Sequence, residues 1–457
     1  MAGIGFKLRK MRKDNSLTSL AKSYTYASLL SSGPWVSSII AILIISFLNN
    51  SLESEDGKVV AYQLIITYAF AFASSIMLTG FIQLPFTRYV ADKIYENRED
   101  LVLPSFFGAL LVTNVIGILF LTPLAFYIFE GQSLIFILLV IYIFIIMTSI
   151  WLANILASSL KFYRGTFIAY FIIYTLIVLF SYYFGDSVEK IMAIFLFGNL
   201  ALLIILTSFI AINYPSHTLI SFNFFRRKNF YWFLGFSGLF YSLGVWIDKF
   251  IFWYHPLTGS EILGKLHGSI VYDVPIFMAY LTIVPGMALF FFRLEAYFSQ
   301  KYELFFDAVK EGGTLKTIES YKDGMIDVIR QAIREVLYIQ SILFIMIYLY
   351  TPQIFSFLNI PLLYTNLFHI DMIGAQLQLG FMSVLAILFY LDRRRATMWL
   401  SLMFFLLNGL LTLYSIHLGP YFFGYGYALS LLIVFTCSLL VIKKTLKDIV
   451  YETFLLR

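Results

Sequence analysis

Twelve long apolar segments divide this sequence, and its cationic residues fall almost entirely into every second gap between them. A helix needs about 20 apolar residues to cross the hydrocarbon core of a bilayer. Segments of that kind lie at 24–48, 62–84, 103–129, 134–158, 166–184, 191–212, 230–253, 269–292, 336–358, 368–391, 397–417 and 421–442. They lack the two-residue alternation that is typical of membrane β-barrels. We therefore predict an all-α polytopic membrane protein with twelve transmembrane helices.

The distribution of charge predicts how these helices are oriented. All but four of the 32 Lys and Arg residues lie in the N-terminal segment, in alternate gaps or in the C-terminal tail. The exceptions are Lys58, Lys190, Lys249 and Lys265. Because Lys- and Arg-rich loops stay on the cytoplasmic side of a membrane, we expect a multi-pass protein of the cytoplasmic (inner) membrane with both termini in the cytoplasm.

The composition narrows the possible partners and cofactors. With 60% hydrophobic and 13% charged residues, the chain lies far outside the range of soluble domains. Its net charge of +6 sits at helix ends, where membrane lipids with anionic headgroups neutralise it, so we expect no nucleic-acid partner. A single cysteine, Cys437, excludes a disulfide framework and a Cys-based metal site. The His residues lack metal-ligand spacing and no phosphate-binding Gly-rich loop follows a strand, so we expect no cofactor and no metal.

An internal repeat predicts two lobes. The pattern Ser-x-Gly-x-Trp occurs at 31–35 in the first segment and again at 242–246 in the seventh. The second and eighth segments both end in Pro, Arg and then Tyr-Glu, in the same order. We therefore predict six-helix lobes at 1–229 and 230–457, related by an axis along the membrane normal, with substrate bound between them.

One cationic gap, 293–335, is much longer than the others and carries charges of both signs. Apolar residues recur in it at helical spacing, with a break at Gly312-Gly313. We predict that this cytoplasmic amphipathic segment is largely helical. Two interpretations stay open and are compatible: an extension of the neighbouring helices along the membrane surface, or a docking surface for cytoplasmic partners.

Ionisable residues at membrane depth are costly and therefore mark candidate functional sites. The clearest are Asp248 and Lys249 in the seventh segment and Asp273 near the start of the eighth. Because neighbouring helical positions point about 100° apart, we do not expect Asp248 to pair well with Lys249. We expect Lys249 to reach Asp273 instead, which leaves Asp248 facing a central cavity. The alternative is that these side chains extend to the outer membrane interface.

Two tryptophans and a Gly-Pro pair complete the candidate residues. Trp35 and Trp246, the matching tryptophans of the internal repeat, are further substrate-path candidates. Gly33 and Pro34 are hinge candidates, since Gly- and Pro-broken helices often move in transporters. The alternative for Gly33 is close packing between helices. We assign no catalytic residues.

The chain also resembles a known family. The opening Met-Ala-Gly-Ile-Gly-Phe, Ser32-Gly33-Pro34-Trp35 and Trp246-Ile247-Asp248-Lys249 are similar to the PelG family of exopolysaccharide exporters. The resemblance implies membership of the multidrug/oligosaccharidyl-lipid/polysaccharide exporter superfamily, with two six-helix lobes around a central cavity. It also implies an N-acetylgalactosamine-rich polymer as cargo. The implied partners are a cyclic di-GMP receptor, a membrane scaffold and a cytoplasmic glycosyltransferase of the PelD, PelE and PelF types.

Three functions compete, and polysaccharide export across the cytoplasmic membrane is favoured. A small-solute secondary transporter of the major facilitator type shares the twelve segments, but its long loop normally lies between the halves. Here the longest cationic gap follows the eighth segment instead. A membrane polymerase would need acidic or His residues on a large outer loop, and the outer loops are short, so we do not expect an enzyme.

Overall fold

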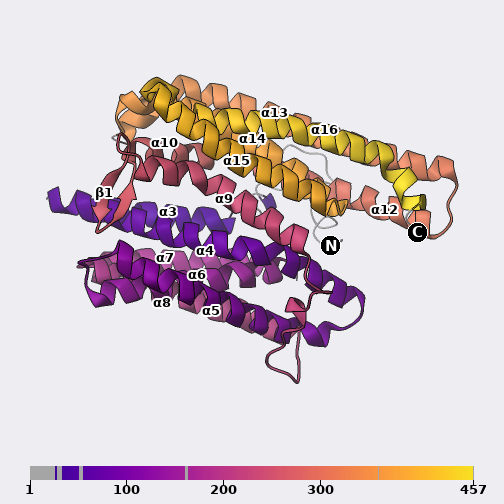
Figure 1. Cartoon of the computed structure of the whole chain (residues 1–457), viewed down its shortest axis with the longest axis horizontal. Helices are drawn as coiled ribbons and strands as arrows, with labels where there is room; N and C mark the ends of the chain where they lie inside the picture. The colour runs from indigo at the N-terminus through magenta and orange to yellow at the C-terminus, as the bar shows by residue number, and fades with distance from the viewer. Residues whose placement is uncertain (1–25, 28–32, 51–54, 160–162, 359, 456–457) are drawn as a thin grey trace. The chain divides into compact units, whose positions relative to one another are not determined.

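The computed structural model describes residues 26–27, 33–50, 55–159, 163–358 and 360–455, and each of the twelve predicted segments overlaps with helix in these residues (Figure 1). The helices are α3 (Gly33–Asn50), α4 (Glu55–Tyr95), α5 (Val102–Ile128), α6 (Leu134–Ser159), α7 (Tyr163–Phe184), α8 (Val188–Asn213), α9 (Trp232–Tyr254), α10 (Ile270–Leu281), α11 (Val284–Arg293), α12 (Ser299–Lys310), α13 (Leu315–Phe357), α14 (Thr365–Tyr390), α15 (Arg394–Leu418) and α16 (Tyr425–Leu455). Short 3₁₀ turns lie at Glu99–Leu101, Asn223–Phe225, Leu362–Tyr364 and Pro420–Phe422. In the described residues, ten helices are long and apolar enough to cross a membrane. The prediction of an all-α membrane protein is confirmed.

The chain forms two compact units, whose boundaries fall between Gly33 and Pro34 and between Ile270 and Val271. Unit 2 comprises 34–270, and unit 1 comprises 271–457 with the N-terminal residues. Helix α9 belongs to unit 2 because it packs along α4. The predicted lobes divide the chain at 229/230 instead. Their relation by an axis along the membrane normal stays a prediction.

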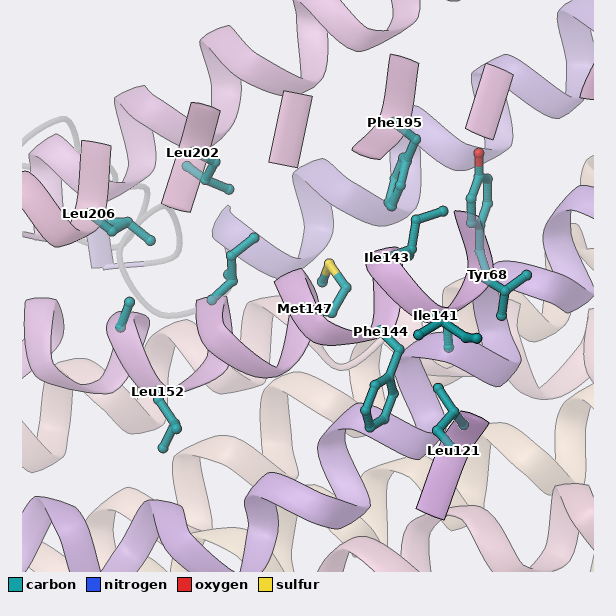
Figure 2. Close-up of a cluster of buried hydrophobic side chains, with 14 of the residues drawn as sticks. Tyr68, Leu121, Ile141, Ile143, Phe144, Met147, Leu152, Phe195, Leu202 and Leu206 are labelled. Carbon is teal, nitrogen blue, oxygen red and sulfur yellow. The ribbon is translucent and has the colours of Figure 1, made fainter. Parts of the chain in front are cut away.

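The core of unit 2 lies between α4, α6 and α8, which carry apolar side chains on the faces that meet. Phe144 and Met147 on α6 point into the same cluster as Phe195 on α8, and the ring of Tyr68 on α4 stacks on Phe195 with centroids 4.4 Å apart (Figure 2). Many apolar side chains of α5 and α7 are exposed instead, for example Phe120 and Phe171. Exposed apolar faces on membrane helices are suited to contact with lipid.

A seam of small residues holds α9 against α4 in unit 2. A Cβ added at Gly80 would lie 2.6 Å from Ser242 Oγ and 2.9 Å from the Gly238 carbonyl oxygen, and one added at Gly238 would overlap the Gly80 carbonyl. Gly235 approaches Phe81 in the same way. Only residues without a larger side chain allow two membrane helices to approach so closely.

A short β-hairpin follows α9, and no sequence pattern identified above predicts it. Strands β1 (Ser260–Leu263) and β2 (Leu266–Gly268) pair antiparallel around a two-residue turn, Gly264-Lys265. Gly264 has φ +57°, a conformation that glycine adopts without strain. Lys265 fixes the turn to the end of α5, where it pairs with Glu130 at 2.6 Å and lies over the Tyr127 ring. The hydrogen bond from Lys265 lowers the pKa of the Glu130 carboxyl.

In unit 1, α14, α15 and α16 run alongside one another, and α13 packs on α14 (Figure 1). The predicted eighth segment is divided into α10 and α11 at Thr282-Ile283. Pro285 explains the break, since it has no N–H to continue the helix and its ring clashes with the carbonyl four residues earlier. Helix α13 has 43 residues, about 65 Å at 1.5 Å per residue, roughly twice the thickness of the hydrocarbon core. It therefore extends well beyond the membrane.

The prediction that 293–335 is largely helical is confirmed. A π-helical turn, Leu294–Phe298, joins α11 to α12, and α12 packs antiparallel on the first half of α13 after the break at Gly312, which has φ +75°. The apolar residues that recur at helical spacing face inward: Phe298, Phe305, Ile318, Met325 and Ile329 are buried. Arg293 at the end of α11 donates two hydrogen bonds to the carboxylate of Glu335.

Candidate functional site

A buried ion pair lies in the last third of α9. The Lys249 ammonium donates to both carboxylate oxygens of Asp248, at 3.1 and 3.2 Å, and to the carbonyl oxygen of Val245 at 2.8 Å. Asp248 is fully buried and Lys249 is 5% exposed. The Lys249 ammonium also lies 6.0 Å from the ring centroid of the half-buried Trp246.

The expectation that Asp248 and Lys249 do not pair is wrong. Helical side chains lean toward the N-terminus of their helix, over the residues three and four positions earlier. For Asp248 and Lys249 these positions converge on a single residue, Val245. The two charged groups therefore meet above Val245 although their Cα–Cβ bonds diverge.

Packing against α4 places this pair inside unit 2. Gly238, Ser242 and Lys249 follow one another at spacings of four and seven, so they share the face of α9 that contacts α4. Both side chains are buried in the chain as a whole, so the alternative of extension to the outer interface does not describe Asp248. Each charge compensates the other, and an ion buried alone in this region would be strongly unfavourable.

Unit 1 contains a buried carboxylate that the sequence analysis does not single out. Asp371 lies in the second turn of α14 and is fully buried. The backbone of Gly424, with φ +81°, approaches it so closely that a Cβ there would lie 2.8 Å from Asp371 Oδ1. The sequence contains a sign of this residue, because Asp371 is the one acidic residue inside the predicted segment 368–391.

A set of amides surrounds the broken helix of unit 1. Gln340 on α13 donates from Nε2 to the Ile283 carbonyl at the break, at 3.2 Å, and Gln376 on α14 donates to the Gln340 carbonyl, at 3.2 Å. The Tyr427 hydroxyl donates to Gln378 Oε1 at 2.5 Å. The amide of Gln340 therefore links α13 to the break between α10 and α11, and Gln376 links α14 to α13.

The remaining candidate residues lie in the first turns of α10 and α3. Asp273 is half-buried in the first turn of α10, in unit 1, so its predicted pairing with Lys249 of unit 2 stays a prediction. The backbone of Gly33, Pro34 and Trp35 lies in the first turn of α3, but their side chains lie outside the described residues. The boundary between the two units falls between Gly33 and Pro34. Their role as a hinge stays a prediction.

In the described ranges no group of three His, Cys, Asp or Glu side chains could hold a metal ion. Two other features of the site are known from transporters. A buried pair such as Asp248–Lys249 can exchange its partner for another ion or a proton. A discontinuous helix in the membrane is a common feature of transporters.

Solved structures with a similar fold are transporters. An outward-facing multidrug resistance transporter of the MATE family, within the MOP superfamily, has a TM-score of 0.60 at 12% identity, over 93% of this chain and 96% of that one. A MOP superfamily transporter from Pyrococcus furiosus has the same values, and an inward-facing MATE transporter has a TM-score of 0.54 at 13% identity, over 92% and 95% of the chains. At this identity the likeness shows the fold alone. No curated protein sequence matches the chain.

The likeness therefore shows a MATE-like fold for this multi-pass chain. The PelG exopolysaccharide exporter (EPS-E) family matches residues 1–454, nearly the whole chain. The chain belongs to the PelG family and is a membrane polysaccharide exporter. Family and fold indicate a transporter and not an enzyme, and they do not favour the major facilitator alternative.

Proposed function

We propose that this exporter carries an amino-sugar-containing exopolysaccharide out of the cytoplasm across the cytoplasmic (inner) membrane, with both of its termini in the cytoplasm. The observation that carries the proposal is the family match over residues 1–454 on a MATE-like fold. The alternation of cationic and cation-poor loops supports the orientation. An N-acetylgalactosamine-rich cargo follows from the family resemblance.

The Asp248–Lys249 pair is the proposed ionic site on the substrate path. Lys249 is the cation that neutralises Asp248 in this structure. A deacetylated amino sugar carries an ammonium group of the same charge, so it can compete with Lys249 for the Asp248 carboxylate. The nearby ring of Trp246 supports the proposal, because it offers an apolar face to a sugar. Trp35 is proposed for the same role in the first helix.

The helical pair formed by α12 and the first half of α13 is the proposed docking surface for partners. Its buried face is apolar, while Lys316, Glu319, Asp323 and Asp327 are exposed on the other side. Mixed exposed charges of this kind favour selective protein contacts. The proposed partners are a membrane scaffold, a cyclic di-GMP receptor and a cytoplasmic glycosyltransferase of the PelE, PelD and PelF types.

The experiment is deletion of the gene in its host, followed by complementation. Polymer is quantified separately in the medium and inside the cells. Loss of extracellular polymer with intracellular accumulation, reversed by the wild-type chain, supports export. Loss of polymer from both fractions points to a role in synthesis, and unchanged extracellular polymer contradicts the proposal.

A further inference from the structure

The loop that joins α8 to α9, residues 214–231 (the basic loop), is fixed to unit 2 although it contains little helix. The Ser221 N–H donates to the Pro104 carbonyl at 2.9 Å, and Gly108 lets the Ser221 carbonyl approach α5. Phe224 is fully buried, with its ring 5.2 Å from Phe86 and 5.3 Å from Phe230. The loop therefore presents a defined outer surface.

That outer surface combines apolar and cationic side chains. Leu219, Ile220 and Phe222 are 78%, 49% and 52% exposed. Arg226, Arg227 and Lys228 begin four positions after Phe222, and all three are exposed. The flanking helices α8 and α9 coincide with predicted membrane segments, so the loop lies at the membrane surface. Exposed apolar residues beside cations are the pattern of segments that insert into the headgroup region.

Several cationic residues elsewhere in the chain form ion pairs. Arg88 pairs with Asp92, Arg293 with Glu335, and Arg394 with Asp392. In contrast, no acidic residue occurs between Glu189 and Asp248 in the sequence. Within the part of the chain that the structure describes, Arg226, Arg227 and Lys228 form no ion pair.

We propose that the basic loop binds anionic phospholipid. Arg226, Arg227 and Lys228 contact the phosphate of the headgroup, and Leu219, Ile220 and Phe222 insert between the acyl chains. The complementary charge of the lipid and the position of the loop at the membrane surface identify this occupant. The proposal is independent of the polysaccharide and of the Asp248–Lys249 pair. It also goes beyond the general excess of cationic residues in cytoplasmic loops, because it assigns binding to one loop in which cations lie close to exposed apolar side chains.

The test compares two variants of the purified full-length chain that lose equal charge. Arg226→Gln/Arg227→Gln/Lys228→Gln alters the basic loop, and Lys443→Gln/Lys444→Gln/Lys447→Gln alters exposed lysines on α16. Native mass spectrometry measures bound phosphatidylglycerol, with phosphatidylcholine as the uncharged reference. The loop variant should bind phosphatidylglycerol about tenfold or more weakly. The α16 variant should stay within about twofold of the wild type.

Two further measurements identify the ligand and control for misfolding of the loop variant. Inorganic phosphate should not displace the lipid, because it lacks acyl chains, whereas displacement at millimolar phosphate would overturn the lipid assignment. Arg226→Lys/Arg227→Lys keeps the charge and should retain binding, which shows that the loop tolerates substitution. Equal losses in the two triple variants, or unchanged binding in the loop variant, would overturn the proposal.

Discussion

Lys249 forms a bidentate contact with its own sequence neighbour, Asp248, at 3.1 and 3.2 Å, and both side chains are buried in unit 2. The pair places two opposite charges inside a membrane transporter without leaving either of them alone. A substitution at either residue can therefore affect both the stability of the protein and its transport activity. The variants below separate these two effects.

A double-mutant cycle measures how much Asp248 and Lys249 stabilise each other. Asp248→Asn leaves Lys249 buried without a counter-ion, and Lys249→Met leaves Asp248 in the same state, so each should destabilise the protein by about 3–5 kcal/mol. Asp248→Asn/Lys249→Met removes both charges and should recover much of that loss. Thermal unfolding in detergent and abundance in membranes measure the effect. Additive losses in the double variant would mean that the two residues do not stabilise each other.

The same double variant tests the substrate path. If Asp248 binds the cationic groups of the polymer, the double variant should export less polymer than the wild type at matched abundance. Lys249→Arg keeps the charge and is the control. Full export by the uncharged double variant would limit the pair to a structural role.

The close packing of α4 against α9 predicts that one added methyl group at Gly238 destabilises the protein. Gly238→Ala places a Cβ against the Gly80 carbonyl, and the overlap should cost about 1–3 kcal/mol or more. Gly324→Ala on α13 is the matched control, because its nearest neighbour would lie at an ordinary 3.4 Å. The control should be neutral or stabilise the helix by up to about 1 kcal/mol. Equal melting temperatures for the two variants would contradict the close contact.

The predicted orientation is tested by cysteine labelling. The native Cys437 is first replaced by Ser, and single cysteines are then introduced at Asn15, Ser54 and Glu452. A membrane-impermeant maleimide applied to intact spheroplasts should label Ser54→Cys, on the outside. It should reach Asn15→Cys and Glu452→Cys only after the membrane is permeabilised. The opposite result at Ser54 would reverse the orientation.

Charge reversal tests the proposed docking surface on α13. Lys316→Glu/Lys322→Glu should reduce the recovery of a co-expressed glycosyltransferase and scaffold, because attraction becomes repulsion at the contact. Membrane insertion should not change, since Lys316 is exposed and the Lys322 ammonium lies 3.8 Å from its nearest carboxylate. Lys443→Glu/Lys447→Glu on α16 is the control. Unchanged recovery of the partners would leave the segment as an extension of the membrane helices.

Hydropathy predicts the helices of this chain well because a membrane helix must satisfy its backbone internally and match the thickness of the bilayer. It does not locate the break before Pro285, since proline is tolerated in membrane helices and hydropathy does not show where a helix is interrupted. The hairpin at 260–268 is also missed. Its strands are short, and the local sign is the pair Gly264-Lys265 between two leucines.

The site is harder to predict than the fold, because it depends on side-chain direction. Asp248 and Lys249 are correctly identified as buried ionisable residues, but their pairing depends on how both side chains lean over Val245. Asp371 lies close to the predicted start of its segment, so sequence position alone does not distinguish burial from an interfacial location. The placement of α9 in unit 2 follows from its contacts with Gly80, which no repeat pattern encodes.

Transport of the polymer in inverted membrane vesicles tests the central claim most directly. Polymer is synthesised at the exposed cytoplasmic face, and a polymer-specific hydrolase is then added. Vesicles that contain the wild-type chain should protect polymer inside them, and detergent should abolish that protection. Vesicles from the deletion strain should leave the polymer accessible. Equal protection with and without the chain would contradict its role as the exporter.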